Sequence, residues 1–133
     1  MASILFITDP DNWEIVNKEN IMGINGRFSR NLFSKIQVKD KCVIYVTKNT
    51  GFKGVFEVIS KNQNRKVNWK KGNYQYLIEL NPIFIPKNPV RIEKILDNLK
   101  FIKNKKYYGI QLQYEKFIPD EDLNFILKAM KSQ

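Results

Sequence analysis

The hydrophobic pattern of this chain centres on two short apolar runs that are rich in β-branched residues. Residues 42–46 (CVIYV) and 55–59 (VFEVI) are separated by a mostly polar segment that contains two glycines. This pattern predicts two antiparallel strands joined by a hairpin loop. Side chains alternate along a strand, so Ile44 should face one side of the sheet and Val43 the other. Neither side is polar, and we therefore expect other parts of the chain to cover both faces.

Other segments show the spacing of shorter strands and helices. Apolar runs predict further strands or extended segments at residues 3–8, 21–24, 74–80 and 109–114. The third should break at Asn81-Pro82, and pairing could resume at residues 83–85. Helical spacing with suitable end signals predicts helices at residues 10–20, 29–36, 90–99 and 118–131. Asp9 and Pro10 mark the start of the first helix, as N-cap and first helical residue. We expect an α+β domain of five or six short strands, curled into a small β-barrel with short helices around it.

Length and composition place the chain among folded globular domains. Its 133 residues suffice for one domain spanning 1–133, and apolar residues make up 43% of the sequence. Apolar runs stay well short of the roughly 20 residues that a membrane helix needs, so no membrane partner is expected. The start of the chain, MASILFITDP, lacks the basic and long apolar regions of a signal peptide. Cys42 is the only cysteine, which excludes an internal disulfide and favours an intracellular, cytoplasmic location.

The charge balance is the first indication of function. Lysine and arginine number 23 against 13 aspartate and glutamate residues, which gives a formal net charge of +10. An excess of this size favours a polyanionic partner, most often nucleic acid, either DNA or RNA. The alternative is that the positive charge serves solubility alone. The oligomeric state stays open, with a monomer favoured over an oligomer.

Histidine is absent from the sequence, which removes the commonest general acid–base and the commonest metal ligand. With a single cysteine, a zinc site cannot be assembled from Cys and His, and no cofactor is expected. Catalysis would have to rest on carboxylates, lysine or tyrosine. Asp9, Asp11 and Glu14 cluster at the first predicted helix, where they could hold a magnesium ion or stabilise the helix N-terminus. Their spacing fits the second role better.

Two basic segments, residues 61–71 and 100–106, contain no acidic residue. Aromatic residues accompany both of them, Trp69 and Tyr74 the first and Tyr107 the second. Cations neutralise phosphates and aromatic faces stack on bases, so this combination is typical of proteins that bind single strands or flipped bases. The alternative is a pair of solvated loops whose aromatic residues fold back on the core.

Several segments together resemble the EVE domain family, in the form seen in archaeal members. The resemblance rests on short motifs along nearly the whole chain, namely Asp11-Asn12-Trp13, Met22-Gly23-Ile24, Arg30-Asn31, and residues 38–46 (VKDKCVIYV), 54–60 (GVFEVIS), 99–106 (LKFIKNKK) and 118–127 (IPDEDLNFIL). The run at 99–106 is the most specific of them. The resemblance implies a PUA-like fold, in which a small β-barrel is wrapped by helices, as in the related YTH and ASCH domains.

The same resemblance implies a function. YTH domains enclose a methylated adenine in an aromatic cage, and some EVE domains bind cytosine modified at its 5 position in DNA. The implied role is a non-catalytic reader that flips a base into a pocket. The family commonly has Trp-Gly-Val where this chain has Met22-Gly23-Ile24, so a thioether replaces an indole as one wall of the expected cage.

We therefore predict a nucleic-acid-binding module that is not an enzyme and that reads a modified, for example methylated, base. The predicted pocket walls are Met22, Trp69 and Tyr74. The predicted readers of base edges are Asp9, Asn25 and Asn31, and the predicted phosphate contacts are Arg30, Lys103, Lys105 and Lys106, with Tyr107 beside them. Two other interpretations stay open. One is a small-ligand or protein-interaction domain on the same scaffold, and the other is a carboxylate-based nuclease, which the absent histidine and the capping acids disfavour.

Overall fold

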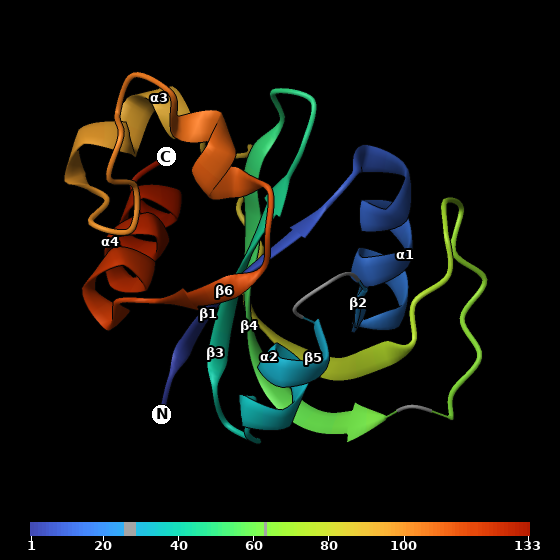
Figure 1. Cartoon of the computed structure of the whole chain (residues 1–133). Helices are drawn as coiled ribbons and strands as arrows, with labels where there is room; N and C mark the ends of the chain where they lie inside the picture. Colours follow the sequence, from blue (N-terminus) through green and yellow to red (C-terminus); the bar gives the residue numbers. More distant parts are fainter. Residues whose placement is uncertain (26–28, 63) are drawn as a thin grey trace.

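A curled sheet of six strands forms the framework of the protein (Figure 1). The computed structural model describes residues 1–25, 29–62 and 64–133. The strands are β1 (Ser3–Thr8), β2 (Ile21–Ile24), β3 (Lys41–Val46), β4 (Gly51–Asn62), β5 (Tyr76–Phe84) and β6 (Lys116–Ile118). Their order across the sheet is β2-β5-β4-β3-β1-β6. The predicted α+β class with five or six curled strands is confirmed, and the sheet forms an open half-barrel with β2 and β6 at its edges.

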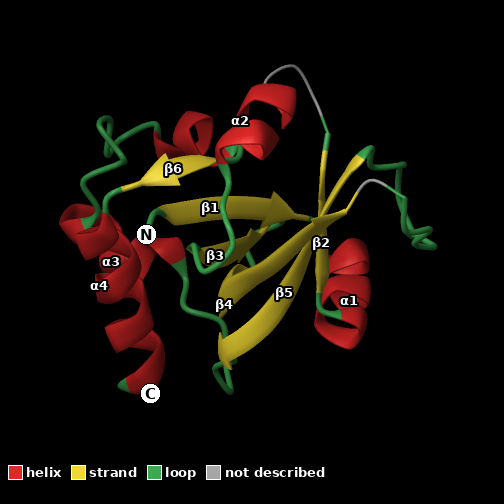
Figure 2. Ribbon diagram, turned by 90° about the horizontal axis from the view of Figure 1, so that it is seen from below, coloured by secondary structure: helices red, strands yellow, loops and turns green. Residues whose placement is uncertain are grey.

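Helices cover both sides of this sheet. They are α1 (Pro10–Glu19), α2 (Ser29–Lys35), α3 (Ile92–Ile95) and α4 (Asp120–Lys131), with 3-10 turns at Leu96–Asn98 and Tyr108–Leu112. Figure 1 and Figure 2 both show α3 and α4 together at one end of the molecule and α1 at the other. Within the described ranges, every helix is too short or too polar to span a bilayer.

Two hydrophobic clusters, one on each side of the sheet, form the core. The first lies between the sheet and the pair α3 and α4, and it includes Val43 and Tyr45. The second lies between the sheet and α1, and it includes Cys42, Ile44 and Trp13. Alternate residues of β3 therefore enter different clusters, which confirms that both faces of this strand are covered. Cys42 is fully buried, and burial raises the pKa of its thiol.

The predicted hairpin between β3 and β4 is present, but its second strand begins earlier than the sequence pattern indicated. The pairing reaches the end of β3, where Val46 lies opposite Gly51. Gly51 has a φ of +117°, and a Cβ atom there would lie 2.5 Å from the carbonyl oxygen of Val90. Only glycine allows this approach, which lets Phe52 and Val90 exchange backbone hydrogen bonds of 2.8 and 3.0 Å.

The position of α1 follows from the pairing of β1. β1 runs parallel to β3 along its whole length, from Ser3 opposite Lys41 to Thr8 opposite Val46. The chain then turns directly into α1, where the carboxylate of Asp9 accepts a hydrogen bond of 2.8 Å from the backbone nitrogen of Asn12. The predicted N-cap and first turn are confirmed. The N-terminus of α1 is thereby fixed at the carboxyl end of β1.

β5 differs from the prediction at both ends. It begins at Tyr76 instead of residue 74, and it continues through Asn81 and Pro82 to Phe84 instead of breaking there. Proline is tolerated at this point because the described pairing of β2 with β5 ends at Glu79. The Leu80 nitrogen still donates to the Asn20 carbonyl oxygen at 2.8 Å, but the strand β2 does not extend far enough to face Pro82, so the missing N–H is tolerated there as on an edge strand.

The predicted strand at residues 109–114 is wrong. Part of this segment belongs to the 3-10 turn Tyr108–Leu112, and the last strand is β6, which pairs antiparallel with β1. Ile110, Leu112 and Tyr114 alternate with polar residues as in a strand, but Leu112 is buried whereas Ile110 is 62% and Tyr114 57% exposed. The alternation therefore does not reflect a buried face. The predicted helix at 90–99 is likewise shorter, because it divides into α3 and the turn Leu96–Asn98.

Candidate functional site

An aromatic pair and a pocket lie together on the segment between β4 and β5, residues 64–75, which we call the pocket loop. The rings of Trp69 and Tyr74 meet edge to face, with centroids 4.9 Å apart and planes at 69°. A pocket of about 330 Å³ adjoins them, and Arg65, Asn68 and Asn73 contribute to its lining. This volume lies at the lower end of the range for ligand pockets, roughly 300–1,000 Å³. The structure thus brings together two of the three residues that we predicted as pocket walls.

The backbone of β2 supports this aromatic pair. A Cβ atom on Gly23 would lie 2.6 Å from the Cβ of Tyr74 and 3.0 Å from Cζ2 of Trp69, so a larger residue there would displace the rings. Met22, the third predicted wall, is only 2% exposed and belongs to the hydrophobic cluster beneath α1. Neighbouring residues of a strand face opposite sides, so Gly23 meets the aromatic pair whereas Met22 points into the core. Met22 is therefore a core residue and does not line the pocket, contrary to its predicted role as a wall.

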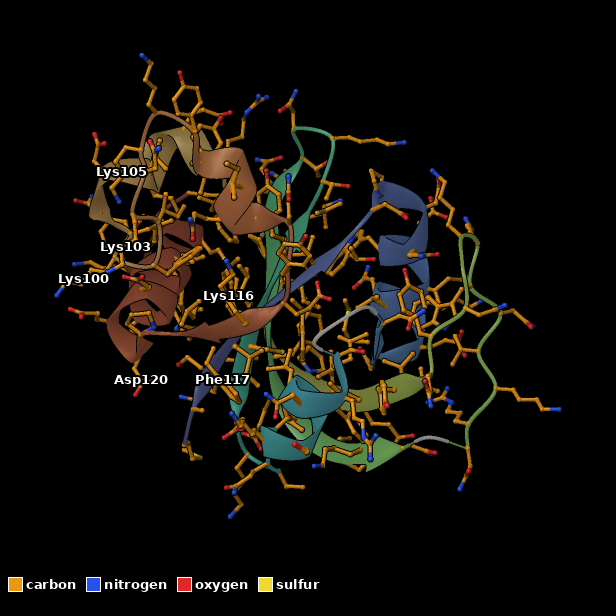
Figure 3. All side chains as sticks on the ribbon, in the orientation of Figure 1. Lys100, Lys103, Lys105, Lys116, Phe117 and Asp120 are labelled. Carbon is orange, nitrogen blue, oxygen red and sulfur yellow. The ribbon has the colours of Figure 1, made fainter. Side chains whose placement is uncertain are left out.

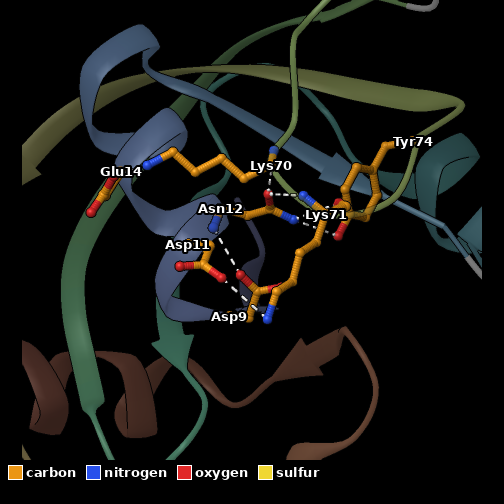
Figure 4. A network of polar contacts seen from close by, with 7 residues as sticks. All are labelled: Asp9, Asp11, Asn12, Glu14, Lys70, Lys71 and Tyr74. Carbon is orange, nitrogen blue, oxygen red and sulfur yellow. Dashed lines mark hydrogen bonds and ion pairs between the residues drawn. The ribbon is translucent and has the colours of Figure 1, made fainter.

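A single buried amide connects α1 to the pocket loop (Figure 4). Asn12 is fully buried, and its Nδ2 donates to the carbonyl oxygen of Lys71 at 2.9 Å and to the hydroxyl of Tyr74 at 3.1 Å. Its Oδ1 accepts from the backbone nitrogens of Lys70 and Lys71, both at 3.0 Å. We did not predict a role for Asn12. A signal was present in the sequence, because Asn12 is a polar residue one turn before Val16 on the inward face of the predicted helix.

Ion pairs add to this connection on the solvent side. Lys70 pairs with Glu14, and Nζ of Lys71 lies 3.1 Å from Oδ2 of Asp11. These pairs raise the pKa of both lysines, and the hydrogen bond from Lys71 lowers the pKa of Asp11. The predicted basic segment at 61–71 is thus less positive in the fold than in the sequence, because α1 supplies acidic partners that are distant in the chain.

Arg65 is also held by acidic residues. Its guanidinium lies 3.2 Å from Oε1 of Glu19 and 3.5 Å from Oε1 of Glu79, which come from α1 and β5. A planar guanidinium that contacts two carboxylates has a fixed orientation. Arg65 thus lines the pocket at the junction of the loop with the sheet, with its guanidinium directed toward α1 and β5.

The predicted readers of base edges have different surroundings. Asp9 caps α1, and Nδ2 of Asn25 donates to the carbonyl oxygen of Asn73 in the pocket loop at 3.0 Å. Both side chains therefore help to shape the site. Arg30 and Asn31 lie on the exposed side of α2, where the carbonyl oxygen of Asn31 accepts from the Ser34 hydroxyl at 2.7 Å. Among the residues that the structure describes, neither of these two side chains forms a hydrogen bond or ion pair with the pocket loop.

The second basic segment lies at the opposite end of the molecule. Lys103 and Lys105 are beside α3 and α4 (Figure 3), whereas the pocket loop is beside α1 in both Figure 1 and Figure 2. Nζ of Lys105 donates to the carbonyl oxygen of Leu99, and Nζ of Lys106 lies 5.6 Å from the ring centroid of Tyr107. The structure therefore does not bring Lys103, Lys105, Lys106 and Tyr107 together with the aromatic pair.

One titratable group near the site was not predicted at all. Glu115 is half-buried just before β6, and burial raises the pKa of its carboxyl group to about 7. Burial also raises the pKa of the Tyr74 hydroxyl, and the charges of Asp9 and Glu115 raise it further. Glu115 is thus close enough to the site to influence Tyr74. Nothing in the linear sequence marks this residue, since its burial depends on β6 pairing with β1.

Comparison with known proteins gives matches over the whole chain. The model of the EVE domain matches residues 3–129. A UPF0310 protein of Pyrococcus horikoshii is 28% identical over 147 aligned positions, which cover 98% of this chain and 99% of the relative.

Two solved structures share the fold at low sequence identity. The YTH domain of Zygosaccharomyces rouxii MRB1, solved in complex with N6-methyladenosine RNA, has a TM-score of 0.68 at 14% identity, covering 96% of this chain and 86% of that one. Human THYN1, solved in complex with 5-methylcytosine-containing DNA, has a TM-score of 0.66 at 9% identity, covering 100% and 99%. At these identities the likeness concerns the fold alone.

Gly23→Ala should destabilise the protein. The added methyl group would lie 2.6 Å from Tyr74 and force the aromatic pair away from β2. We expect a loss of about 1–3 kcal/mol in the free energy of unfolding, as for other overpacked sites. The matched control is Gly109→Ala, where nothing lies within 4 Å of the new methyl group. Urea titration of both variants measures the difference, and equal midpoints would contradict the close contact at Gly23.

The stability of the protein should fall as pH rises through the titration of Glu115. The carboxyl group has a pKa of about 7 in the folded protein, against an ordinary value of 4.5, so the folded state holds this proton more tightly. Its contribution is fully present below pH 4.5 and is lost as the pH passes 7. Glu115→Gln should therefore reduce the pH dependence across this interval, measured by urea unfolding at a series of pH values. An identical pH profile in the variant would show that Glu115 does not titrate there.

Proposed function

The chain belongs to the EVE domain family, and on that basis we propose that it is a non-catalytic domain that binds nucleic acid and holds one base in the pocket beside Trp69 and Tyr74. The observation that carries this proposal is the aromatic pair, 4.9 Å between centroids, next to a pocket of about 330 Å³. Aromatic faces stack on any base, and each stacked base contributes about 1–3 kcal/mol. The proposed ligand is a single-stranded segment or a base flipped from a duplex.

Polar groups at the same pocket are suited to reading the edge of a base. Asn68 and Asn73 line it, and an amide side chain offers both donors and an acceptor to a base edge. Lys66 lies in the same lining, where an ammonium group can neutralise a neighbouring phosphate. The side chains of Asp9 and Asn25, in contrast, are engaged in capping α1 and holding Asn73, so we assign them to the support of the pocket.

We further propose that the base is a modified one. This finer proposal is supported by the two solved relatives of the same fold, whose complexes contain N6-methyladenosine RNA and 5-methylcytosine DNA. A methyl group adds apolar surface, which gains free energy when an aromatic wall removes it from water. The pocket of this protein provides such walls in Trp69 and Tyr74.

The domain is proposed to bind without making or breaking bonds. The carboxylates in the cap and first turns of α1, which the sequence suggested as a metal site, already have structural partners: Asp9 caps α1, Asp11 pairs with Lys71, and Glu14 pairs with Lys70. A nuclease would need at least one of them released to activate water. Incubating the protein with plain and modified strands in the presence of magnesium tests this directly, and strand cleavage would contradict the proposal.

Binding is tested with a panel of short DNA and RNA strands, single and double, plain or carrying a central 5-methylcytosine or N6-methyladenosine. We expect saturable binding that weakens as salt rises, because phosphate contacts release counterions. A dissociation constant that is lower for one modified strand than for its plain counterpart supports base reading. Equal binding of modified and plain strands supports nucleic-acid binding but contradicts the modified base. If the protein binds none of the strands, the proposal is wrong and the small-ligand or protein-interaction alternative is favoured.

Trp69→Ala should weaken the binding of the best strand by about 1–3 kcal/mol, which is the contribution of one stacked base. The control is Phe117→Ala, which removes a ring that is 38% exposed on β6, away from the pocket loop. Fluorescence anisotropy with a labelled strand measures both variants. If the two changes have the same effect, the aromatic pair is not the binding site.

The second basic segment, residues 100–106, gives an independent prediction. Lys103 and Lys106 are exposed, whereas the ammonium group of Lys105 is occupied by the carbonyl of Leu99. If the bound strand reaches this loop, replacing Lys103 and Lys106 by alanine should lower the slope of log affinity against log salt by about 1.4, since each phosphate contact on a single strand contributes about 0.7. An unchanged slope would restrict the interface to the end of the molecule that carries the pocket loop.

A further inference from the structure

We infer that Asn12 is the positioning residue of the pocket loop: its buried amide fixes the backbone on which Trp69 and Tyr74 stand, without itself contacting the ligand. The inference rests on the proposed function and adds to it the residue that keeps the pocket in its binding conformation. Asn12 lies on α1, far from the loop in sequence but in direct contact with it in the fold (Figure 4).

The hydrogen bonds of Asn12 match the full capacity of an amide side chain. An amide offers two N–H donors and an oxygen with two acceptor positions. The donors go to the Lys71 carbonyl and the Tyr74 hydroxyl, and the oxygen accepts from the backbone nitrogens of Lys70 and Lys71. All four partners belong to the pocket loop, and they lie between Trp69 and Tyr74 or on Tyr74 itself. No other amino acid side chain of this size supplies two N–H donors and a carbonyl acceptor together.

The ion pairs of Lys70 and Lys71 are weaker determinants of the conformation of the pocket loop. The ion pairs of Lys70 with Glu14 and of Lys71 with Asp11 join side chains that are 47–65% exposed, so water and salt screen them. They also hold the ends of flexible side chains and leave the backbone free. Asn12, in contrast, is fully buried and bonds the backbone itself. A buried hydrogen-bonding group that loses its partner is costly, so the loop has a strong preference for the conformation that satisfies this amide.

The affinity for a strand depends on the fraction of molecules whose pocket loop is in the binding conformation. The apparent dissociation constant rises in proportion as the binding-competent fraction of the protein falls. Removing the amide releases the Lys70 and Lys71 nitrogens to water and lets the loop adopt other conformations. The aromatic pair is then assembled in only part of the molecules. The chemistry of the pocket is unchanged, because Trp69 and Tyr74 are still present.

The test compares Asn12→Ala with Asp11→Ala, which removes a surface ion pair from the same turn of α1. Hydrogen exchange of the Lys70 and Lys71 backbone amides is measured in the free proteins. Binding of a short single-stranded DNA with a central 5-methylcytosine, and of its RNA counterpart with N6-methyladenosine, is measured by anisotropy. We expect rapid exchange and an approximately tenfold higher dissociation constant for Asn12→Ala, which corresponds to about one molecule in ten with a competent loop. Asp11→Ala should retain slow exchange.

A double-substitution cycle separates positioning from general stability. If Asn12 acts through the aromatic pair, then Asn12→Ala should weaken binding far less in a Trp69→Ala background than in the natural protein. Additive effects of the two changes would overturn the inference, and so would unchanged exchange of the Lys70 and Lys71 amides in Asn12→Ala. Asn12→Asp provides a conservative variant in case Asn12→Ala does not fold. It keeps the oxygen that accepts from Lys70 and Lys71 but places a second oxygen against the Lys71 carbonyl, to which the amide donated. Exchange of these amides should therefore be faster than in the natural protein, and exchange as slow as in the natural protein would overturn the inference.

Failure of this inference is distinguishable from failure of the proposed function. If the natural protein binds none of the strands, the proposed function is wrong, and the role of Asn12 in ordering a nucleic-acid pocket falls with it. If the natural protein binds and Asn12→Ala binds equally well with slow exchange, the proposed function stands and only the positioning role is wrong.

Discussion

The structure depends on the burial of β3 on both of its faces. Val43 and Tyr45 enter the cluster under α3 and α4, while Cys42 and Ile44 enter the cluster under α1. A strand with two apolar faces is stable only when both are covered, so the chain must place helices on each side of the sheet. The parallel pairing of β1 with β3 then determines where α1 begins, because α1 follows β1 after a single residue. The candidate site is built on this start, from which Asn12 reaches the pocket loop.

Three buried polar side chains have the same role in different parts of the fold: each accepts hydrogen bonds from two backbone nitrogens. Asp40 accepts from the backbone nitrogens of Ala2 and Gln37, Asp122 accepts from those of Lys100 and Phe101, and Asn12 accepts from two nitrogens of the pocket loop. All three are at most 3% exposed. Irregular segments carry backbone donors that no strand or helix satisfies, and a buried acceptor both satisfies them and fixes the segment. Asn12 differs from the two aspartates because it also donates, and so it can hold the hydroxyl of Tyr74.

The sequence allowed the framework to be predicted because local chemistry determines it. The alternation around Ile44, the cap at Asp9 and the EVE-like motifs all gave the correct elements. The failures have a common cause in long-range packing. Pro82 remains within β5 because β2 ends early on that side, and residues 109–114 alternate without a buried face. Trp69 and Tyr74 were predicted as pocket walls and lie in contact beside the pocket, whereas Met22, the third predicted wall, is buried in the core. The two basic segments proved to lie at opposite ends of the molecule. The inward position of Asn12 could have been inferred from its helical spacing, but its partners in the pocket loop and the burial of Glu115 follow only from the fold.

The distribution of charge in the fold changes what the net charge of +10 means for binding. Around the pocket loop, Arg65, Lys70 and Lys71 are each paired with acidic residues. A phosphate that approaches Lys70 or Lys71 must therefore compete with a carboxylate that is already in contact. The long-range attraction of a polyanion still follows the net charge, because it depends on the sum of charges and not on their pairing. The net charge of the whole protein would then speed the first encounter with a nucleic acid strand. The aromatic pair, which Asn12 of α1 holds in place, would determine which strands remain bound.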